Sequence, residues 1–410
     1  MSHPITPEIL AAWDAADPLA PYRSRFHLPA GIVYLDGNSL GCLPLTAKHR
    51  VAQACAEEWG EGLIRSWTGA DWLNLPIRVG GKIARLIGAA PHEVIAADST
   101  SINLYKTLVA AVRLRPDRPV IVTEADNFPT DLYIIDSIAE QLGLTVRRVR
   151  PNEVIEAIDD QVAVVALTHV NYRTAMIHDM QQITAAVHAR GGLTIWDLAH
   201  TTGAMPCDLN GANADFAIGC GYKYLNGGPG APAFVFVASR HQTRATQPLT
   251  GWLGHSAPFA FDARFDPALG MSRFLCGTPS ILSLTALDAA LDVFETVSLA
   301  AVRDKSRRMT DAFVTLFDET LVSWGFTLCC ERDGSRRGSH VAFRHPDGSA
   351  IMQAITAQGL IGDFRPPDVL RFGFAPLYNR YADVQALVDV VLSVMRARAG
   401  LSAVTAAAGS

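Results

Sequence analysis

The chain of 410 residues is predicted to fold as a large doubly wound α/β domain joined to a smaller α+β domain. Short apolar runs alternate with amphipathic stretches from about residue 92 to residue 237. Several runs are continuous in Val, Ile and Ala, as is typical of parallel strands buried on both faces. After about residue 275 the pattern changes to long helical stretches with two short strands.

The α/β region contains seven predicted strands separated by segments of helical length. Two of these helical segments are STSINLYKTLVAAVRL (99–114) and TDLYIIDSIAEQLG (130–143). Strand and helix in alternation predict a mostly parallel sheet covered by helices. The strands are EVIAA (93–97), PVIVTE (119–124), LTVRRV (144–149), VAVVALT (162–168), LTIWD (193–197), DFAIG (215–219) and APAFVFV (231–237).

The C-terminal region is predicted to be helix-rich. Helices are expected at 280–297, 300–322, 349–359 and 382–399, with short strands at SHVAFR (339–344) and VLRFGF (369–374). We therefore expect three segments: residues 1–50 contributing to the small domain, residues 51–275 forming the large domain, and residues 276–410 completing the small domain.

Composition limits the classes of function. A net charge of -5 with 18% charged residues gives no electrostatic basis for binding nucleic acid or an anionic membrane. Seven cysteines without a CxxC spacing argue against a disulfide framework or a metal site. No secretory signal opens the chain, and no uncharged apolar run reaches the roughly 18 residues that span a bilayer. These features predict a cytoplasmic protein that acts on a small molecule.

Polar residues follow the ends of several predicted strands. In open α/β sheets, ligands bind beyond the carboxyl ends of the strands, where these residues should meet. The sequence therefore predicts one ligand site, built from residues 98–101, 126–128, 168–169, 197–200 and 221–223.

The stretch DSTS (98–101) follows a strand and opens a helix. Hydroxyl groups and free backbone N–H groups at a helix N-terminus suit a phosphate. Taken alone, the stretch is more typical of a simple N-cap by Ser99 or Thr100, which needs no ligand.

Asp197 ends an apolar strand, where its carboxylate is expected to be desolvated. Such a carboxylate needs a cationic partner, and a protonated ring nitrogen would serve. By itself, Asp197 also fits a cap of the following turn. His200 lies three residues further on and has the chemistry to donate to a phosphate or a ring oxygen, although a lone histidine is more often structural.

Lys223 is the single cation of the apolar stretch GCGYKYLNGGPGAPAF (219–234). A buried lysine is costly unless it is paired or chemically employed, and a desolvated lysine can form a Schiff base with a carbonyl. The alternative is a lysine that extends to the surface from a strand end. A phosphate anchor, a carboxylate and a lysine together predict pyridoxal 5'-phosphate as cofactor.

Six stretches carry a resemblance to a known family: YLDGNSLG (34–41), DSTSINLYK (98–106), DNFPTDLYI (126–134), WDLAHTTGAMPCDL (196–209), residues 219–234 and LRFGFAPLYN (370–379). Over nearly its whole length the chain resembles the kynureninase family, fold-type I pyridoxal-phosphate enzymes of the aminotransferase class V superfamily. The resemblance implies hydrolysis of L-kynurenine or its 3-hydroxy form to anthranilate or 3-hydroxyanthranilate and L-alanine. It also implies a homodimer with a place in tryptophan catabolism and NAD biosynthesis.

The resemblance further implies roles for individual residues. Lys223 would be the Schiff-base lysine and general base, and Asp197 would hold the pyridine nitrogen. Tyr222 would bind the phosphate and relay a proton, with a purely phosphate-binding hydroxyl as the alternative. Arg371 would bind the substrate α-carboxylate through its guanidinium fork. The other cofactor contacts would come from Thr100, Ser101, Phe128 (stacked on the ring), Pro129, Thr130, Asp131, Thr168, His200, Trp252 (of the neighbouring subunit) and Thr278 (where some relatives have Asn).

The sequence departs from the patterns of three alternative classes of protein. Cysteine desulfurases and selenocysteine lyases place a histidine before the lysine and a catalytic cysteine in the small domain, whereas here Tyr222 precedes Lys223 and no cysteine leads to Arg371. LDGNSLG and NFPTD argue against an aminotransferase. A catalytically silent relative has no reason to keep a buried charge pair.

Overall fold

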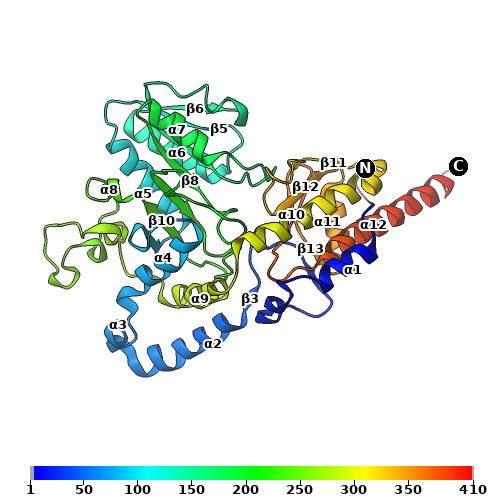
Figure 1. The fold of residues 1–410 in the computed structure, drawn as a ribbon, viewed down its shortest axis with the longest axis horizontal. Helices are drawn as coiled ribbons and strands as arrows, with labels where there is room; N and C mark the ends of the chain where they lie inside the picture. The colour runs from blue at the N-terminus through cyan, green and yellow to red at the C-terminus, as the bar shows by residue number, and fades with distance from the viewer. Residues whose placement is uncertain (1–3, 409–410) are drawn as a thin grey trace. The chain divides into compact units, whose positions relative to one another are not determined.

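The computed structural model describes residues 4–408, with side chains described through residue 400. The chain forms two compact units, each described here by itself (Figure 1). The larger comprises Leu43–Tyr172 and Ile177–Thr296, and the smaller comprises Met1–Cys42, Arg173–Met176 and Val297–Ser410. The domain boundaries at residues 50 and 275 stay predictions. The two compact units are defined by contacts within the chain, and contacts do not show which segments fold independently.

A seven-stranded sheet forms the centre of the larger unit, and helices pack against it (Figure 1). The strand order is β4-β10-β9-β8-β7-β5-β6. All pairings from β9 to β6 are parallel, and β10 runs antiparallel to both of its neighbours. The predicted, mostly parallel α/β fold is confirmed. The strands are β4 (Val94–Ala97), β5 (Val120–Glu124), β6 (Thr145–Val149), β7 (Val162–Thr168), β8 (Leu193–Asp197), β9 (Phe216–Gly219) and β10 (Ala233–Val237).

Burial follows the sequence pattern of the strands. Every residue of β7 and β8 is buried, because helices cover both faces of the central strands. The edge strand β6 is only partly buried and carries Arg147 and Arg148, charges that discourage pairing with another strand. The helices of this unit are α2 (Leu45–Gln53), α3 (Ser66–Gly69), α4 (Leu75–Leu86), α5 (Thr100–Arg113), α6 (Pro129–Leu142), α7 (Met180–Ala189), α8 (Ser239–Gln242) and α9 (Ile281–Leu291).

The smaller unit contains an antiparallel sheet of order β11-β12-β15-β14. Phe343 of β12 stacks on Phe313 of α10 and on Phe372 of β15, with ring centroids 5.5 and 5.7 Å apart. The aromatic stack therefore ties helix to sheet. The helices and strands of this unit include β2 (Val33–Tyr34), β11 (Thr327–Leu328), β12 (His340–Arg344), β13 (Leu360–Ile361), β14 (Asp363–Arg365), β15 (Val369–Gly373), α1 (Pro7–Ala15), α10 (Leu299–Leu316), α11 (Gly348–Ala357) and α12 (Tyr381–Ala408). Two further strands of two residues each, β1 (Phe26–His27) and β3 (Leu43–Pro44), precede the larger sheet in the sequence.

Two predicted helices differ in their C-terminal turns. The helix expected at 280–297 ends at Leu291 and continues as a 3-10 segment, Asp292–Glu295. The helix expected at 300–322 ends at Leu316 and widens into a π-helical turn, Phe317–Leu321. Hydrophobic periodicity does not distinguish these tighter and wider turns from α-helix, since all three bury apolar residues at similar spacing.

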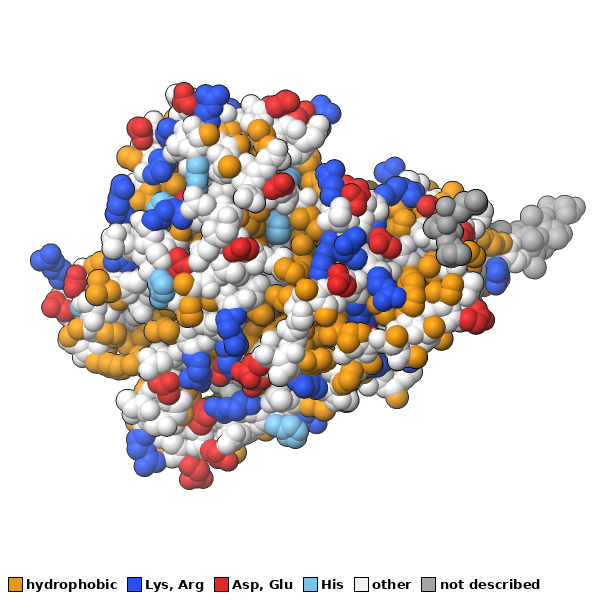
Figure 2. Space-filling view, viewed as in Figure 1, with side chains coloured by type: hydrophobic (Ala, Val, Ile, Leu, Met, Phe, Trp, Pro, Cys, Tyr) orange, Lys and Arg blue, Asp and Glu red, His pale blue; other side chains and the backbone are white. Residues whose placement is uncertain are grey.

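The surface shows cationic and anionic side chains interspersed with apolar ones on the visible face (Figure 2). Among the described helices, none combines the length and the apolar character needed to cross a membrane.

Candidate active site

The predicted site residues of the larger unit gather where the parallel strands end. Thr168, the last residue of β7, is in register with Asp197, the last residue of β8. The chain from β9 reaches Lys223 four residues after Gly219. Because the carboxyl ends of parallel strands share one edge, these three side chains belong to one site.

Asp197 is buried and lies against a second buried carboxyl group, Asp131 at the start of α6. Burial, followed by the charge of Asp197, raises the pKa of Asp131 well above its ordinary value. Burial also raises the pKa of Asp197, but Lys223, the N–H of Ala199 and the hydrogen bond with Asp131 oppose it. Asp131 is therefore the protonated member and donates to the Asp197 carboxylate. The pair retains one negative charge.

Lys223 is half-buried rather than fully enclosed. Its Nζ lies 3.4 Å from His200 Nε2 and 5.9 Å from the centre of the Tyr222 ring. Its charge also favours the ionised forms of Asp131 and Asp197. The lysine predicted from an apolar stretch thus has a polar environment supplied by residues that are distant in sequence.

A hydrogen-bonded chain orders the loop after β5. Thr168 Oγ1 donates to Asn127 Oδ1 over 2.6 Å, and the same oxygen accepts the backbone N–H of Phe128 over 2.7 Å. The Phe128 ring packs edge-on against Tyr172, with centroids 5.3 Å apart. Asn127 therefore connects the end of β7 to the ring that the sequence predicts to stack on the cofactor.

Ser99 is the N-cap of α5 and accepts the N–H of Ile102 over 3.3 Å, as the capping interpretation predicted. Ser99 also lines a cavity of about 300 Å³. Its lining includes Thr100, Tyr222 and Thr278, three residues predicted to contact the cofactor. Hydroxyl groups beside the N-terminus of a 14-residue helix suit the phosphate of the predicted cofactor.

A buried cation supports this cavity from behind. Lys106 of α5 is fully buried, pairs with Asp98, and donates to the carbonyl oxygen of Phe274 over 2.6 Å. Asp98 lines the cavity and has a positive φ of 47°, in the left-handed region. Lys106 therefore holds this strained turn, together with the segment before Cys276, which also lines the cavity.

Trp252 contacts other aromatic residues of its own chain. Its ring lies 6.0 Å from that of Trp67, 5.7 Å from that of Phe259 and 6.4 Å from that of Phe261, between centroids. Phe259 and Phe261 are exposed. The contact of Trp252 with a cofactor of a neighbouring subunit stays a prediction.

Arg371 lies on β15 in the smaller unit and is almost completely buried. Its Nε donates to Asp363 Oδ1 over 2.9 Å, its Nη2 pairs with Asp363 Oδ2, and its Nη2 donates to Ser39 Oγ over 3.0 Å. The guanidinium predicted to bind a carboxylate is therefore already oriented by one.

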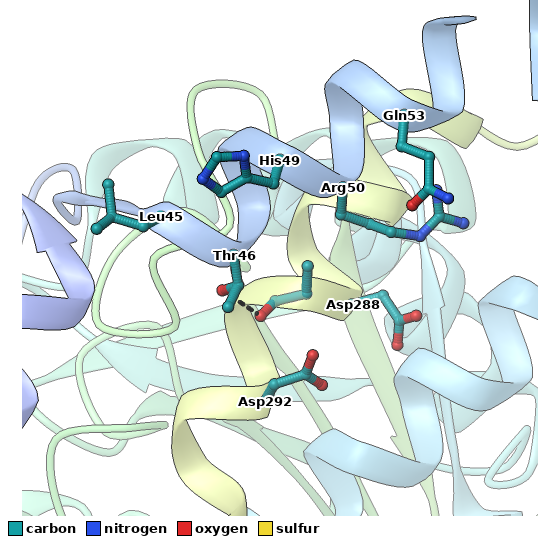
Figure 3. A pocket seen from close by; sticks show the side chains of 8 residues that line it. Leu45, Thr46, His49, Arg50, Gln53, Asp288 and Asp292 are labelled. Carbon is teal, nitrogen blue, oxygen red and sulfur yellow. Dashed lines mark hydrogen bonds between the residues drawn. The ribbon is translucent and has the colours of Figure 1, made fainter. Parts of the chain in front are cut away.

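A second cavity, of about 470 Å³, lies between α2 and α9 in the larger unit (Figure 3). His49 and Arg50 of α2 face Asp288 and Asp292 across it. Its lining contains none of the predicted site residues, so the larger of the two cavities is not the predicted site.

Several residues of the site were given no individual role from the sequence. Asn127 and Tyr172 position Phe128, Lys106 supports the cavity, and Asp363 holds Arg371. Asn127 lies within the stretch DNFPTD, so its position after a strand was the available signal. The partners of Lys106 and Arg371 required the tertiary structure.

Comparisons with known proteins agree with the geometry. The chain is 50% identical to a kynureninase of Pseudomonas fluorescens over 391 residues, covering 94% of each chain. It is also 50% identical to a kynureninase of Burkholderia mallei over 397 residues, covering 95% of each chain. Residues 302–391 match the family model of the kynureninase C-terminal domain. The chain belongs to the kynureninase family.

Solved structures of more distant enzymes share the fold of this chain. A C-DES mutant with glycine covalently linked to its PLP cofactor has a TM-score of 0.79 at 17% identity, with 90% of this chain and 98% of that chain covered. The Escherichia coli cysteine desulfurase CsdA has a TM-score of 0.78 at 21% identity, with 92% and 98% covered. At these identities the likeness establishes the fold alone.

Proposed function

We propose that this kynureninase-family enzyme binds pyridoxal 5'-phosphate and hydrolyses L-kynurenine, or its 3-hydroxy form, to anthranilate or 3-hydroxyanthranilate and L-alanine. The observation that carries the proposal is the grouping of Lys223, His200 and the Asp131–Asp197 pair at the edge of the sheet that also holds the cavity of Thr100 and Tyr222. The grouping provides an amine, a retained negative charge and an anion site at different positions, and these are the three features that the cofactor requires.

The residues present fit the cofactor. Asp197 keeps its charge in a buried place, and the hydrogen bond from Asp131 helps to hold it ionised for a protonated ring nitrogen. Thr100, Ser101, Tyr222, Trp252 and Thr278 would hold the phosphate. Phe128 would cover the ring, with Pro129, Thr130 and Thr168 beside it and His200 at a polar edge. When bound, the cofactor supplies an aldehyde and an electron-withdrawing ring.

The proton transfers are assigned to two residues of this chain. Lys223 removes the proton from the α-carbon of the substrate as general base. Tyr222 transfers a proton through its phenolic oxygen when water adds to the γ-carbonyl group and the Cβ–Cγ bond breaks. Arg371 binds the α-carboxylate of the substrate through its guanidinium fork.

The decisive experiment measures release of anthranilate and 3-hydroxyanthranilate from the two substrates side by side. Wild-type protein should release product, and Lys223→Ala should lose at least about 10²- to 10⁴-fold in rate, the usual share of a general base. Lys48→Ala, at an exposed position of the same unit, is the control and should retain wild-type activity. No release from either substrate would contradict the proposal.

Two further arms separate the alternatives. Sulfide release from L-cysteine in place of anthranilate release would identify a desulfurase. A purified protein that stays colourless with added cofactor would indicate a silent relative. Each of these two measurements compares the wild-type protein with Lys223→Ala. A protein that binds no cofactor is therefore distinguished from an enzyme that acts on another substrate.

The active enzyme is further proposed to be a cytoplasmic homodimer that serves tryptophan catabolism and NAD biosynthesis. The larger unit exposes Ile64 and Phe261 by 76% and 73%, with Trp59, Leu63 and Phe259 also exposed. Phe259 and Phe261 are neighbours, with ring centroids 6.4 Å apart, and contiguous exposed apolar side chains are typical of an interface. Sedimentation should give a dimer, and Phe261→Glu should weaken it.

A further inference from the structure

Arg371 lies within a cluster of charged groups in the smaller unit, several of which have no predicted role. Asp363 accepts from Arg371 through both carboxylate oxygens. Its Oδ2 also accepts from Arg365 Nη2 over 2.7 Å and from Ser39 Oγ over 2.9 Å. Arg371, followed by Arg365 and Ser39, holds the pKa of Asp363 below its ordinary value in spite of burial. Asp363 is therefore an ionised carboxylate with three different donors.

The backbone fixes this carboxylate opposite the guanidinium. Strands β14 and β15 pair antiparallel, and their register places Asp363 directly across from Arg371. Side chains of directly opposed residues lie close together on one face of a sheet. Asp363 cannot leave Arg371 without breaking this pairing or losing several charge-assisted hydrogen bonds at once. It is a permanent partner of the guanidinium rather than a group that a ligand displaces.

The second guanidinium keeps the cluster attractive to an anion. Asp363 divides its charge between Arg371 and Arg365, so that two cations share this one carboxylate. Asp36 is the other acidic group of the cluster, and burial, followed by the charge of Asp363, raises its pKa to about 6. The Asp36 carboxylate is therefore protonated more readily than an ordinary aspartate when an anion approaches.

We propose that Asp363 is a positioning residue for substrate binding: it fixes the plane of the Arg371 guanidinium, so that the α-carboxylate of an amino acid binds beside Asp363 and not in its place. This inference rests on the proposed function, because it takes Arg371 as the group that binds the α-carboxylate. It assigns Asp363 to the recognition of the amino-acid end of the substrate and leaves the aryl end to other residues.

The test compares Asp363→Asn with wild-type holoenzyme. An asparagine keeps the shape but loses the charge and one acceptor, so the guanidinium loses its bidentate partner. We expect KM for L-kynurenine to rise about 10- to 100-fold, the scale of a misplaced binding group, with a smaller change in kcat. The affinity for L-alanine, measured by absorbance titration of the bound cofactor, should fall by a similar factor.

Two controls separate positioning from general damage. Asp318→Asn removes one member of an exposed bidentate pair with Arg332 in the same unit and should change neither quantity. Inhibition by anthranilate, which lacks the α-amino-acid group, should stay unchanged in Asp363→Asn, whereas a merely structural defect would weaken both ligands. The melting temperature of each loaded variant is recorded to detect unfolding.

The possible results are distinct. Unchanged L-alanine affinity in Asp363→Asn would overturn the inference, and tighter L-alanine binding would overturn it by showing that Asp363 competes with the ligand. Unchanged L-alanine affinity in Arg371→Ala would remove the substrate contact on which the inference rests. Absence of anthranilate release by the wild-type enzyme would instead contradict the proposed function.

Discussion

Two buried aspartates of the larger unit, Asp197 and Asp215, lie at opposite ends of the neighbouring strands β8 and β9. Asp215 directly precedes β9, and its carboxylate accepts from His188 Nε2 and His241 Nε2, each over 2.8 Å, and from Arg240 over 2.7 Å. Burial alone would raise the pKa of Asp215, but the hydrogen bonds from the two histidines bring it below its ordinary value.

Asp197 is equally enclosed but has a different set of partners. It faces a second carboxyl group, Asp131, and the half-buried amine of Lys223, and its pKa is raised. Burial therefore does not decide the state of a carboxylate, since the donors around it do. The carboxylate with several donors stabilises the fold, and the one with few is the carboxylate that suits a ligand cation.

Of the two aspartates, Asp197 is expected to have the larger effect on activity when it is replaced by Asn. Removing the charge opposite the cofactor ring should lower kcat/KM roughly 10²- to 10³-fold, the scale of losing one preorganised electrostatic partner. The cofactor-free protein should keep or gain thermal stability, because a buried carboxyl–carboxylate contact is relieved. A large fall in melting temperature would break the comparison by making Asp197 a structural residue.

The largest effect on stability is expected for Asp215→Asn. Losing the anion leaves Arg240 and two histidines without their buried partner, which should cost about 3–5 kcal/mol in the free energy of unfolding. Urea unfolding measures this cost. Asp160→Asn, in an exposed pair with Arg190, is the control and should change the same quantity by no more than about 1 kcal/mol. Activity per folded molecule should be preserved in both variants.

The two sites should respond to pH in opposite directions. The pKa of Asp215 is lowered in the fold, so its stabilisation is present above its unfolded pKa of about 3.9 and is lost as pH falls. The pKa of Asp131 is raised, so its contribution is present below that value and is lost as pH rises through its folded pKa. In cofactor-free protein, Asp131→Asn should therefore gain stability over wild type as pH rises, and urea unfolding at several pH values tests this.

The smallest effect is expected for Asn127→Ala. Thr168 and the N–H of Phe128 each lose an acceptor, which should cost about 1–3 kcal/mol in transition-state stabilisation, since a buried donor is left unpaired. We expect KM for the cofactor to rise, whereas the proton transfer by Lys223 should be unchanged. Unchanged cofactor affinity would show that the loop after β5 orders itself without Asn127.

The strands of the larger sheet could be predicted from the sequence because continuous β-branched and apolar runs have few other uses in a folded chain. Predicted and observed strands agree within two residues at each end, as for 231–237 against Ala233–Val237. The antiparallel direction of β10 could not be predicted, since an apolar run carries no direction. Nor could the assignment of Arg173–Met176 to the smaller unit, which depends on contacts such as that of Thr174 with Glu331.

By itself, the sequence predicted which residues would bring chemistry to the site: a lysine in an apolar stretch, an aspartate ending a strand, and hydroxyls opening a helix. These follow from local patterns, because burial cost and helix ends are properties of short segments. Only the tertiary structure decided how the charges are shared. Asp131 donates to Asp197, Lys106 donates to the carbonyl oxygen of Phe274, and Ser39 donates to Asp363, and each of these contacts joins segments that are far apart in the sequence.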